Sequence, residues 1–189
     1  KHRINWIHLY LGFLYGPHDT TDQLYSWLWR FKHQTKVLVP DILNLRFQWA
    51  YTGDVSEQLK RPPAPNPGGV YPIITHAPIT YGEFFEFLVQ LSGNRPKIYL
   101  VPIDRMQELG LKFSRDFPML RPSERLFEGA VSDKLDGVLR DTLANRRLTP
   151  FEQSLKETWD YYEALGWPEP KAGLSLARET EILAQLEHD

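Results

Sequence analysis

The chain has 189 residues, of which 42 % are hydrophobic and 13 % aromatic, which is enough to bury a core and argues against intrinsic disorder. Its formal charge of −2 gives no net basic field that would favour nucleic acid as a partner. The absence of cysteine excludes disulfides, thiolate metal sites and a cysteine nucleophile. No apolar run reaches the length of a membrane span, and the cytoplasm or an organelle matrix is the default compartment that we expect.

The first part of the chain predicts strands and helices in alternation. Residues 4–14 are rich in bulky apolar side chains, which is typical of a strand buried on both faces. Residues 20–33 carry apolar side chains at helical spacing, and the hydroxyl of Thr20 or Thr21 can cap that helix. We therefore expect a strand that ends at Gly16-Pro17 and an amphipathic helix after it.

Two more strands are predicted, at residues 36–39 and 46–51. Asp54 and Glu57 have the spacing of a capping box, in which each side chain accepts from the other residue's backbone amide. We therefore expect a helix that starts at Asp54.

Residues 61–69 contain four prolines and end in two glycines, which predicts an exposed linker between residues 1–60 and residues 70–189. After it, Thr80 with Glu83 and Thr149 with Glu152 predict two capped helix starts. The expected elements of this part are strands at 70–74 and 97–101, helices at 80–91, 104–109, 132–144, 149–166 and 175–186, and a loop at 113–125.

Several short motifs follow one another in a recognisable order. They are Gly16-Pro17-His18-Asp19 after a strand, Gln48-Trp49 and Asp54-Val55 around the next, Thr80–Phe84 at a helix start, and Ser132–Leu135 and Thr149–Trp159 on later helices. In this order they resemble an extended or atypical short-chain dehydrogenase/reductase (SDR) of the epimerase/dehydratase group, over nearly the whole chain.

The resemblance implies an α/β fold in two parts. Residues 1–60 would supply the terminal strands of a Rossmann-like doubly wound sheet, and residues 70–189 the small α/β substrate-binding lobe of an SDR. We expect the N-terminal nucleotide-binding part to be missing from this chain. The exposed sheet edge would then need another polypeptide to cover it, either the front half of the SDR or subunits of a large complex.

Hydride transfer in this family needs a glycine-rich turn for the pyrophosphate and a Tyr-x-x-x-Lys pair for proton transfer. The sequence contains neither, so we expect no catalytic residue and no cofactor bound by this chain alone, with NAD(P) present only if a nucleotide-binding half is paired with it. The family's Arg-Pro before Gly12 is Tyr10-Leu11 here, and its Asn in a later strand is Pro72. The resemblance leaves at most a vestigial cofactor contact at Leu11 and Gly12.

Six residues are candidates for a substrate pocket. The resemblance places Arg46 and Gln48 on a strand whose family counterpart often helps to hold a phosphate or sugar, and a guanidinium suits phosphate. The others flank the Gly-Pro loop: Phe13, Tyr15, His18 and Asp19. Each has a structural alternative, which is core packing for the two aromatic residues, turn capping for His18 and Asp19, and an exposed strand edge for Arg46.

The remaining polar residues favour no other chemistry. The six histidines have no metal-ligand spacing, so no metal site is expected. Glu179 and Glu181 are interpreted as a solvated helix face, and Trp29 lies off the apolar face of its helix, where an exposed ring would indicate a protein interface.

Two functions remain open. The first is a non-catalytic, SDR-derived subunit that acts as a structural or interaction component of a larger assembly. The second is the C-terminal, substrate-binding half of a split NAD(P)-dependent epimerase, dehydratase or reductase that acts on a nucleotide sugar or a similar substrate. The replacements at Tyr10-Leu11 and Pro72 favour the first, and the Gly-Pro-His-Asp loop with Gln48-Trp49 favours the second.

Overall fold

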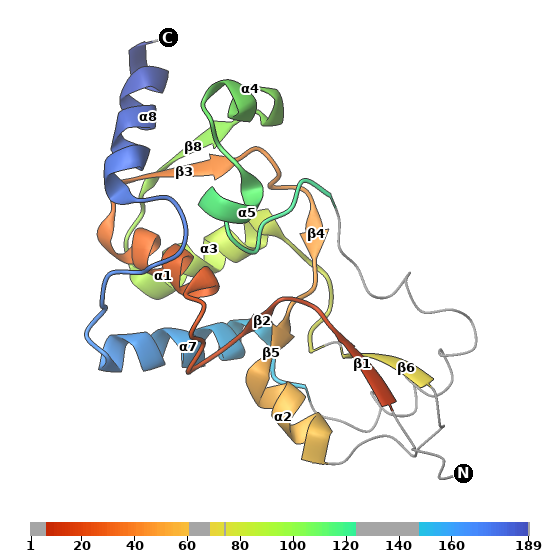
Figure 1. The fold of residues 1–189 in the computed structure, drawn as a ribbon. Coiled ribbons are helices and arrows are strands. Elements are labelled where there is room, and N and C mark those ends of the chain that lie inside the picture. Colours follow the sequence, from red (N-terminus) through yellow and green to blue (C-terminus); the bar gives the residue numbers. More distant parts are fainter. Residues whose placement is uncertain (1–6, 61–68, 74, 124–147, 189) are drawn as a thin grey trace.

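A computed structural model describes residues 7–60, 69–73, 75–123 and 148–188 of the chain (Figure 1). The elements alternate between strands and helices, as an α/β fold requires. In order they are β1 (Ile7–Leu11), β2 (Leu14–Tyr15), α1 (Gln23–His33), β3 (Lys36–Pro40), β4 (Arg46–Phe47), β5 (Ala50–Tyr51), α2 (Thr52–Lys60), β6 (Gly69–Ile73), β7 (Ile79–Thr80), α3 (Tyr81–Ser92), β8 (Lys97–Val101), α4 (Ile103–Glu108), α5 (Phe113–Asp116), α7 (Phe151–Ala164) and α8 (Leu176–His188).

The described strands pair in twos and do not form one wound sheet. The pairs β1–β6, β2–β5 and β3–β8 are parallel, and β4–β7 is antiparallel. Figure 1 shows β1–β6 at one end of the molecule and β3–β8 toward the other. The expected α/β fold with parallel strands is therefore confirmed, whereas the predicted linker at 61–69 lies almost wholly outside the described residues.

Two segments expected to be single strands are each divided. The segment at 4–14 gives β1 and β2, because the carbonyl of Phe13 accepts from Ala50 and the chain leaves β6 to pair with β5. The segment at 46–51 gives β4 and β5, separated by Gln48 and Trp49, which bond instead to His76. The apolar content was predicted correctly, but hydrogen-bond partners distant in the sequence decide where each strand pairing ends.

The core gathers around α1, whose apolar face is buried as predicted at Leu24, Trp27, Leu28 and Phe31. The N-cap position of α1 is Asp22, not Thr20 or Thr21, and its side chain makes no capping bond. Trp29 is half-buried and packs against the core and His33, so it is not the exposed interface ring that was considered.

Of the three predicted capping boxes, one is confirmed. Thr80 and Glu83 exchange both bonds at the start of α3. The box at Asp54 is wrong, because α2 already begins at Thr52 and the Asp54 carboxylate accepts from the amide and hydroxyl of Thr149, at 3.0 and 2.7 Å. Thr149 is consequently not the N-cap of α7, a position that Pro150 takes.

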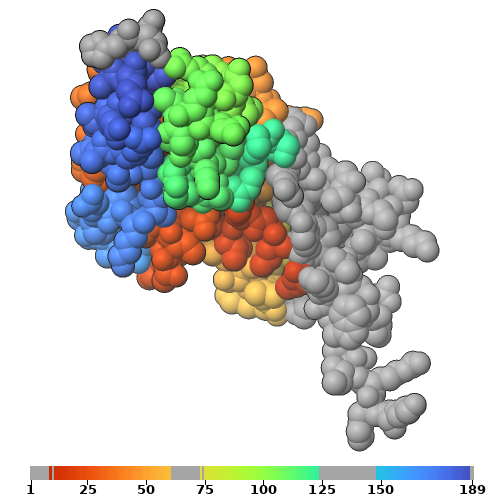
Figure 2. All heavy atoms as spheres, turned by 45° about the horizontal axis from the view of Figure 1, so that its top comes forward, coloured from red at the N-terminus to blue at the C-terminus, as the bar shows by residue number. Residues whose placement is uncertain are grey.

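The C-terminal helix α8 lies alongside the α4–α5 segment, as Figure 2 shows for this face of the molecule. Arg178 on α8 donates to the carbonyl of Leu109 at 2.9 Å, which joins the two. The expectation of a solvated face at Glu179 is wrong, because this side chain is 1 % exposed and pairs with Arg30 of α1.

The loop expected at 113–125 contains the short α5, where Asp116 accepts from the amide of Lys112. The helix expected at 132–144 lies outside the described residues.

Candidate functional site

Tyr15, one of the two aromatic residues predicted beside the Gly-Pro loop, belongs to the core. Tyr15 is fully buried, with its hydroxyl 2.6 Å from Ser154 Oγ on α7 and its ring against Trp49 and Phe151. Burial raises the pKa of the Tyr15 hydroxyl far above its ordinary value. Tyr15 therefore joins β2 to α7 within the core.

The two residues predicted on the phosphate-binding strand point to different places. Arg46 is exposed on β4. Gln48 is 2 % exposed, and its Nε2 donates to the carbonyl of His76 at 3.0 Å. His76 also accepts from the amide of Trp49 through Nε2, at 2.9 Å, and burial lowers its pKa. Gln48 and His76 thus fix the backbone between β4 and β5.

The guanidinium group of Arg121 lies over the ring of Phe13, a contact that the sequence did not suggest. Leu11, Gly12 and Phe13 are half-buried where the chain leaves β1, and the guanidinium carbon of Arg121 is 4.5 Å from the centroid of the Phe13 ring. Arg121 follows α5, in the segment expected to be loop, and no pattern there marks it. Among the described residues, its hydrogen bonds go to Leu120 and Tyr81 and none goes to a carboxylate.

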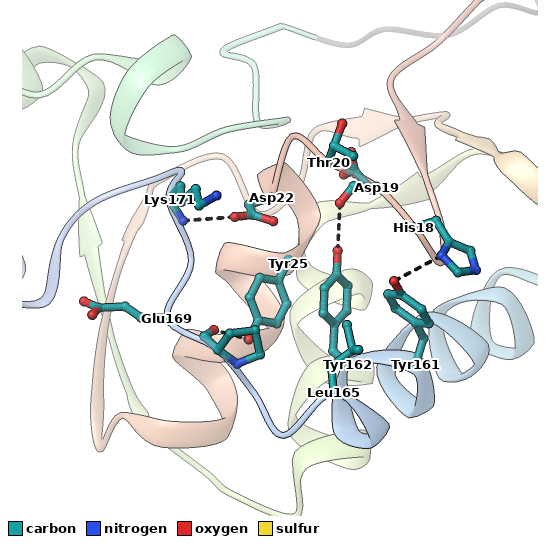
Figure 3. Close-up of a pocket in the computed structure, with 11 residues that line it drawn as sticks. His18, Asp19, Thr20, Asp22, Tyr25, Tyr161, Tyr162, Leu165, Glu169 and Lys171 are labelled. Atoms are coloured by element: carbon teal, nitrogen blue, oxygen red, sulfur yellow. Dashed lines mark hydrogen bonds between the residues drawn. The ribbon is translucent and has the colours of Figure 1, made fainter.

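His18 and Asp19 line a pocket of about 400 Å3 between the loop before α1 and the C-terminal end of α7 (Figure 3). Its other lining residues are Thr20, Asp22, Tyr25, Tyr161, Tyr162, Leu165, Pro168, Glu169 and Lys171. Phe13, Tyr15, Arg46 and Gln48 do not line it, so the six predicted site residues are not brought together in the described part of the chain. The sequence did not point to the tyrosines of α7 as site residues.

Hydrogen bonds hold the pocket's two sides in place. The Tyr161 hydroxyl is 3.1 Å from Nδ1 of His18, and the Tyr162 hydroxyl donates to the carbonyl of Asp19 at 3.3 Å, as Figure 3 shows. The Tyr162 ring is stacked on Tyr25, with 3.8 Å between centroids. The amide of Lys171 donates to Oδ2 of Asp22 at 3.1 Å, which ties the segment after α7 to the start of α1.

Two tyrosines of the pocket, Tyr25 and Tyr162, remain protonated at neutral pH. Burial, assisted by the nearby Asp22 carboxylate, raises the pKa of Tyr25 to about 12. Burial together with Asp19 also raises the pKa of Tyr162 well above its ordinary value. These hydroxyls can donate hydrogen bonds to a neighbour but are poor proton acceptors, so the arrangement suits binding better than general base catalysis.

The described residues offer no other type of site. They include no group of three or more His, Asp or Glu side chains placed to hold a metal ion. Within the same segments, no helix has the length and apolar character needed to cross a membrane.

Comparison with solved structures finds a similar fold in several enzymes. The enzyme WbmH of Bordetella bronchiseptica, in complex with NAD+, matches with a TM-score of 0.57 and 14 % identity over 86 % of this chain and 47 % of its own. The dTDP-glucose 4,6-dehydratase of Bacillus anthracis, in complex with NAD, matches with a TM-score of 0.55 and 18 % identity over 84 % and 44 %. The UDP-glucose 4-epimerase of Thermotoga maritima, with UDP-glucose, matches with a TM-score of 0.55 and 16 % identity over 86 % and 47 %. The chain has the fold of part of an NAD-dependent epimerase or dehydratase.

This SDR resemblance, predicted from the order of short motifs, is confirmed as a structural similarity. At such identities it concerns the fold alone. The chain spans less than half the length of the solved SDR structures that it matches. The sequence matches no protein-family model and no curated protein.

Proposed function

We propose that the chain is a non-catalytic SDR-fold subunit that serves as a structural component of a larger protein assembly. The observation that carries this proposal is the role of Gln48, which the resemblance placed at a substrate phosphate or sugar. Its amide is buried and donates to the backbone carbonyl of His76. The side chain therefore fixes the backbone between β4 and β5 and is not presented to a ligand. Tyr15, bonded to Ser154, supports the same conclusion.

The strand β1 is the proposed attachment point. It pairs in parallel with β6 over five residues, from Ile7 with Gly69 to Leu11 with Ile73. Among the described strands, none pairs with its other edge. An unpaired edge offers a row of backbone donors and acceptors to another strand. We infer that the chain corresponds to the C-terminal half of an SDR and that the partner polypeptide adds a strand to β1.

Native mass spectrometry of the chain, purified gently from its source, tests this function. A complex with other polypeptides and without a dinucleotide mass is the expected result. A complex with one polypeptide and about one dinucleotide that transfers hydride would overturn the non-catalytic role. A stable lone monomer would contradict the proposed partner at β1.

The alternative, a split NAD(P)-dependent epimerase, dehydratase or reductase, has one observation in its favour. Arg121 lies over Phe13, directly after Gly12, and meets no carboxylate among the described residues. A guanidinium held in this way can bind the diphosphate of a nucleotide sugar. UDP-glucose is a suitable probe, because the epimerase of Thermotoga maritima was solved with it.

Variants of the purified complex separate the two functions. If the alternative is correct, Arg121→Ala weakens UDP-glucose binding by about tenfold, the usual cost of one charge-assisted hydrogen bond. Arg95→Ala is the matched control, since Arg95 is also a cation but is exposed after α3. Absence of UDP-glucose binding in the unmodified complex would leave the non-catalytic function standing and remove the alternative.

A further inference from the structure

The pocket around Asp22 has a charge that its surroundings do not neutralise. Three carboxylates line it, from Asp19, Asp22 and Glu169, against the single lysine of its lining, Lys171. No ion pair links Lys171 to the described carboxylates. Burial and, after it, the Asp22 carboxylate raise the pKa of Tyr25. The negative charge of Asp22 therefore acts on a tyrosine that lines the pocket. A cation is therefore favoured here and an anion is opposed.

Of the three carboxylates, Asp22 is the one best placed to receive a ligand. Both Asp19 oxygens accept from the Thr21 hydroxyl, at 2.7 and 2.9 Å, and one also accepts from its amide. Asp22 accepts from the Lys171 amide through Oδ2, and its Oδ1 accepts no hydrogen bond from a described residue. Asp22 is also half-buried, so its position is fixed on one side while the other oxygen remains available.

One wall of the pocket is apolar and preformed. Its walls are the stacked rings of Tyr25 and Tyr162 with Leu165 and Pro168, and the Tyr25 hydroxyl donates to the carbonyl of Pro168. Figure 3 shows the tyrosines of α1 and α7 side by side, beneath the loop that carries Asp19 and Asp22. A volume of about 400 Å3 is within the range of about 300–1,000 Å3 typical of small-molecule sites.

We propose that this pocket binds a small aliphatic amine in its ammonium form. The ammonium group donates to Oδ1 of Asp22, and the methylene groups of the ligand lie against the rings of Tyr25 and Tyr162 and against Leu165. Glu169, at the exposed rim, attracts the cation. The site involves neither β1 nor Arg121, so it is independent of the assembly role and of nucleotide-sugar binding.

Isothermal titration of the full chain with putrescine, in its native complex where one forms, tests the proposal. We expect saturable binding that weakens with added salt, and no binding of succinate, which has the same number of carbons and the opposite charge. Asp22→Asn is the decisive variant, because asparagine keeps the side-chain shape and tolerates the left-handed backbone at this position, φ 56°. It should weaken putrescine binding by about tenfold, as the loss of one charge-assisted bond predicts.

Two further variants keep the result interpretable. Asp160→Asn removes a carboxylate from the exposed pair with Lys156 on α7, outside the pocket, and should leave binding unchanged. Glu169→Gln changes an exposed rim residue, and it should weaken binding by less than Asp22→Asn. Absence of saturable putrescine binding, equal binding by Asp22→Asn and the unmodified chain, or tighter binding of succinate would each overturn the proposal. If Asp22→Asn does not fold, an unchanged affinity in Glu169→Gln would overturn it as well.

Discussion

The parallel pairs β3–β8 and β1–β6 each run for five residue pairs, but they differ in what surrounds them. Val37 to Pro40 of β3 are buried in the main core, and Arg30 and Glu179 bring α1 and α8 onto this strand through the carbonyl and amide of Leu38. Beside β1–β6, the described buried apolar residues form a separate cluster of only Ala50, Val55 and Ile73. Helices of the chain itself cover the first pair, and the second is the end at which we expect a partner.

The largest effect should come from the ion pair that completes the β3 end. Glu179 is 1 % exposed and Arg30 2 % exposed, and the Glu179 carboxylate accepts from Arg30 and from the Leu38 amide. Glu179→Ala leaves a buried guanidinium without its counter-ion, which should lower the free energy of unfolding by about 3–5 kcal/mol in urea titration.

Glu181→Ala is the control for that variant. Glu181 lies two residues away on α8 and pairs with Arg178 at the surface, where an ion pair contributes about 0–1 kcal/mol. Similar losses for the two variants would mean that the buried pair does not close this end of the molecule.

Truncating one apolar side chain at each end compares the two clusters directly. Leu28 is fully buried in the main core, so Leu28→Ala should cost about 3 kcal/mol, the middle of the range for buried leucine. Ile73 belongs to the small cluster, and Ile73→Ala should cost about 2 kcal/mol because fewer neighbours surround the cavity. Urea titration of both variants measures the difference, and a larger loss at Ile73 would contradict the comparison.

Acid should lower the stability of the protein by protonating His76, which accepts a hydrogen bond from the segment between β4 and β5. Burial lowers its pKa from the ordinary value of 6.5, and its Nε2 must stay unprotonated to accept from Trp49. Because the unfolded chain binds the proton more readily, the stability contribution is complete above pH 6.5 and is lost as the pH falls below it. Unfolding curves across this range should show the loss, and His76→Gln, which can still accept from Trp49, should reduce it.

A smaller slope should remain in that variant, because burial also lowers the pKa of His33. The opposite result, a protein that becomes more stable below pH 6.5, would exclude a buried neutral His76.

Local patterns identified the elements of this fold more reliably than their ends. The buried face of α1, the strands β3 and β8, and the order of motifs typical of an SDR could all be predicted, because apolar periodicity and turn residues are local signals. The capping box at Asp54 could not be excluded from sequence, since the competing donor, Thr149, is 95 residues away. Glu179 was misplaced for the same reason, because its partner Arg30 lies on another helix.

The pocket was only partly predictable. The Gly-Pro-His-Asp motif led to His18 and Asp19, but nothing in the sequence connects this loop to Tyr161 and Tyr162, which approach from α7 after more than 140 intervening residues. Asp22 was overlooked as well, because its role depends on the amide of Lys171. Sites assembled from distant segments leave little trace in a single sequence.

The smallest effect concerns the one capping box that the sequence predicted correctly. Thr80 accepts from the Glu83 amide at 3.1 Å, and the Thr80 amide donates to Glu83 at 2.7 Å, at the point where β7 leads into α3. Thr80→Ala should therefore cost about 1 kcal/mol, measured by urea titration, and Thr80→Ser should restore most of it because serine keeps the hydroxyl. The Thr80 amide and hydroxyl both donate to the Glu83 carboxylate and lower its pKa, so the difference between Thr80→Ala and the unmodified chain should shrink as acid protonates Glu83. A cost that stays constant down to acid pH would mean that Thr80 stabilises α3 through the Glu83 amide alone and not through the Glu83 carboxylate.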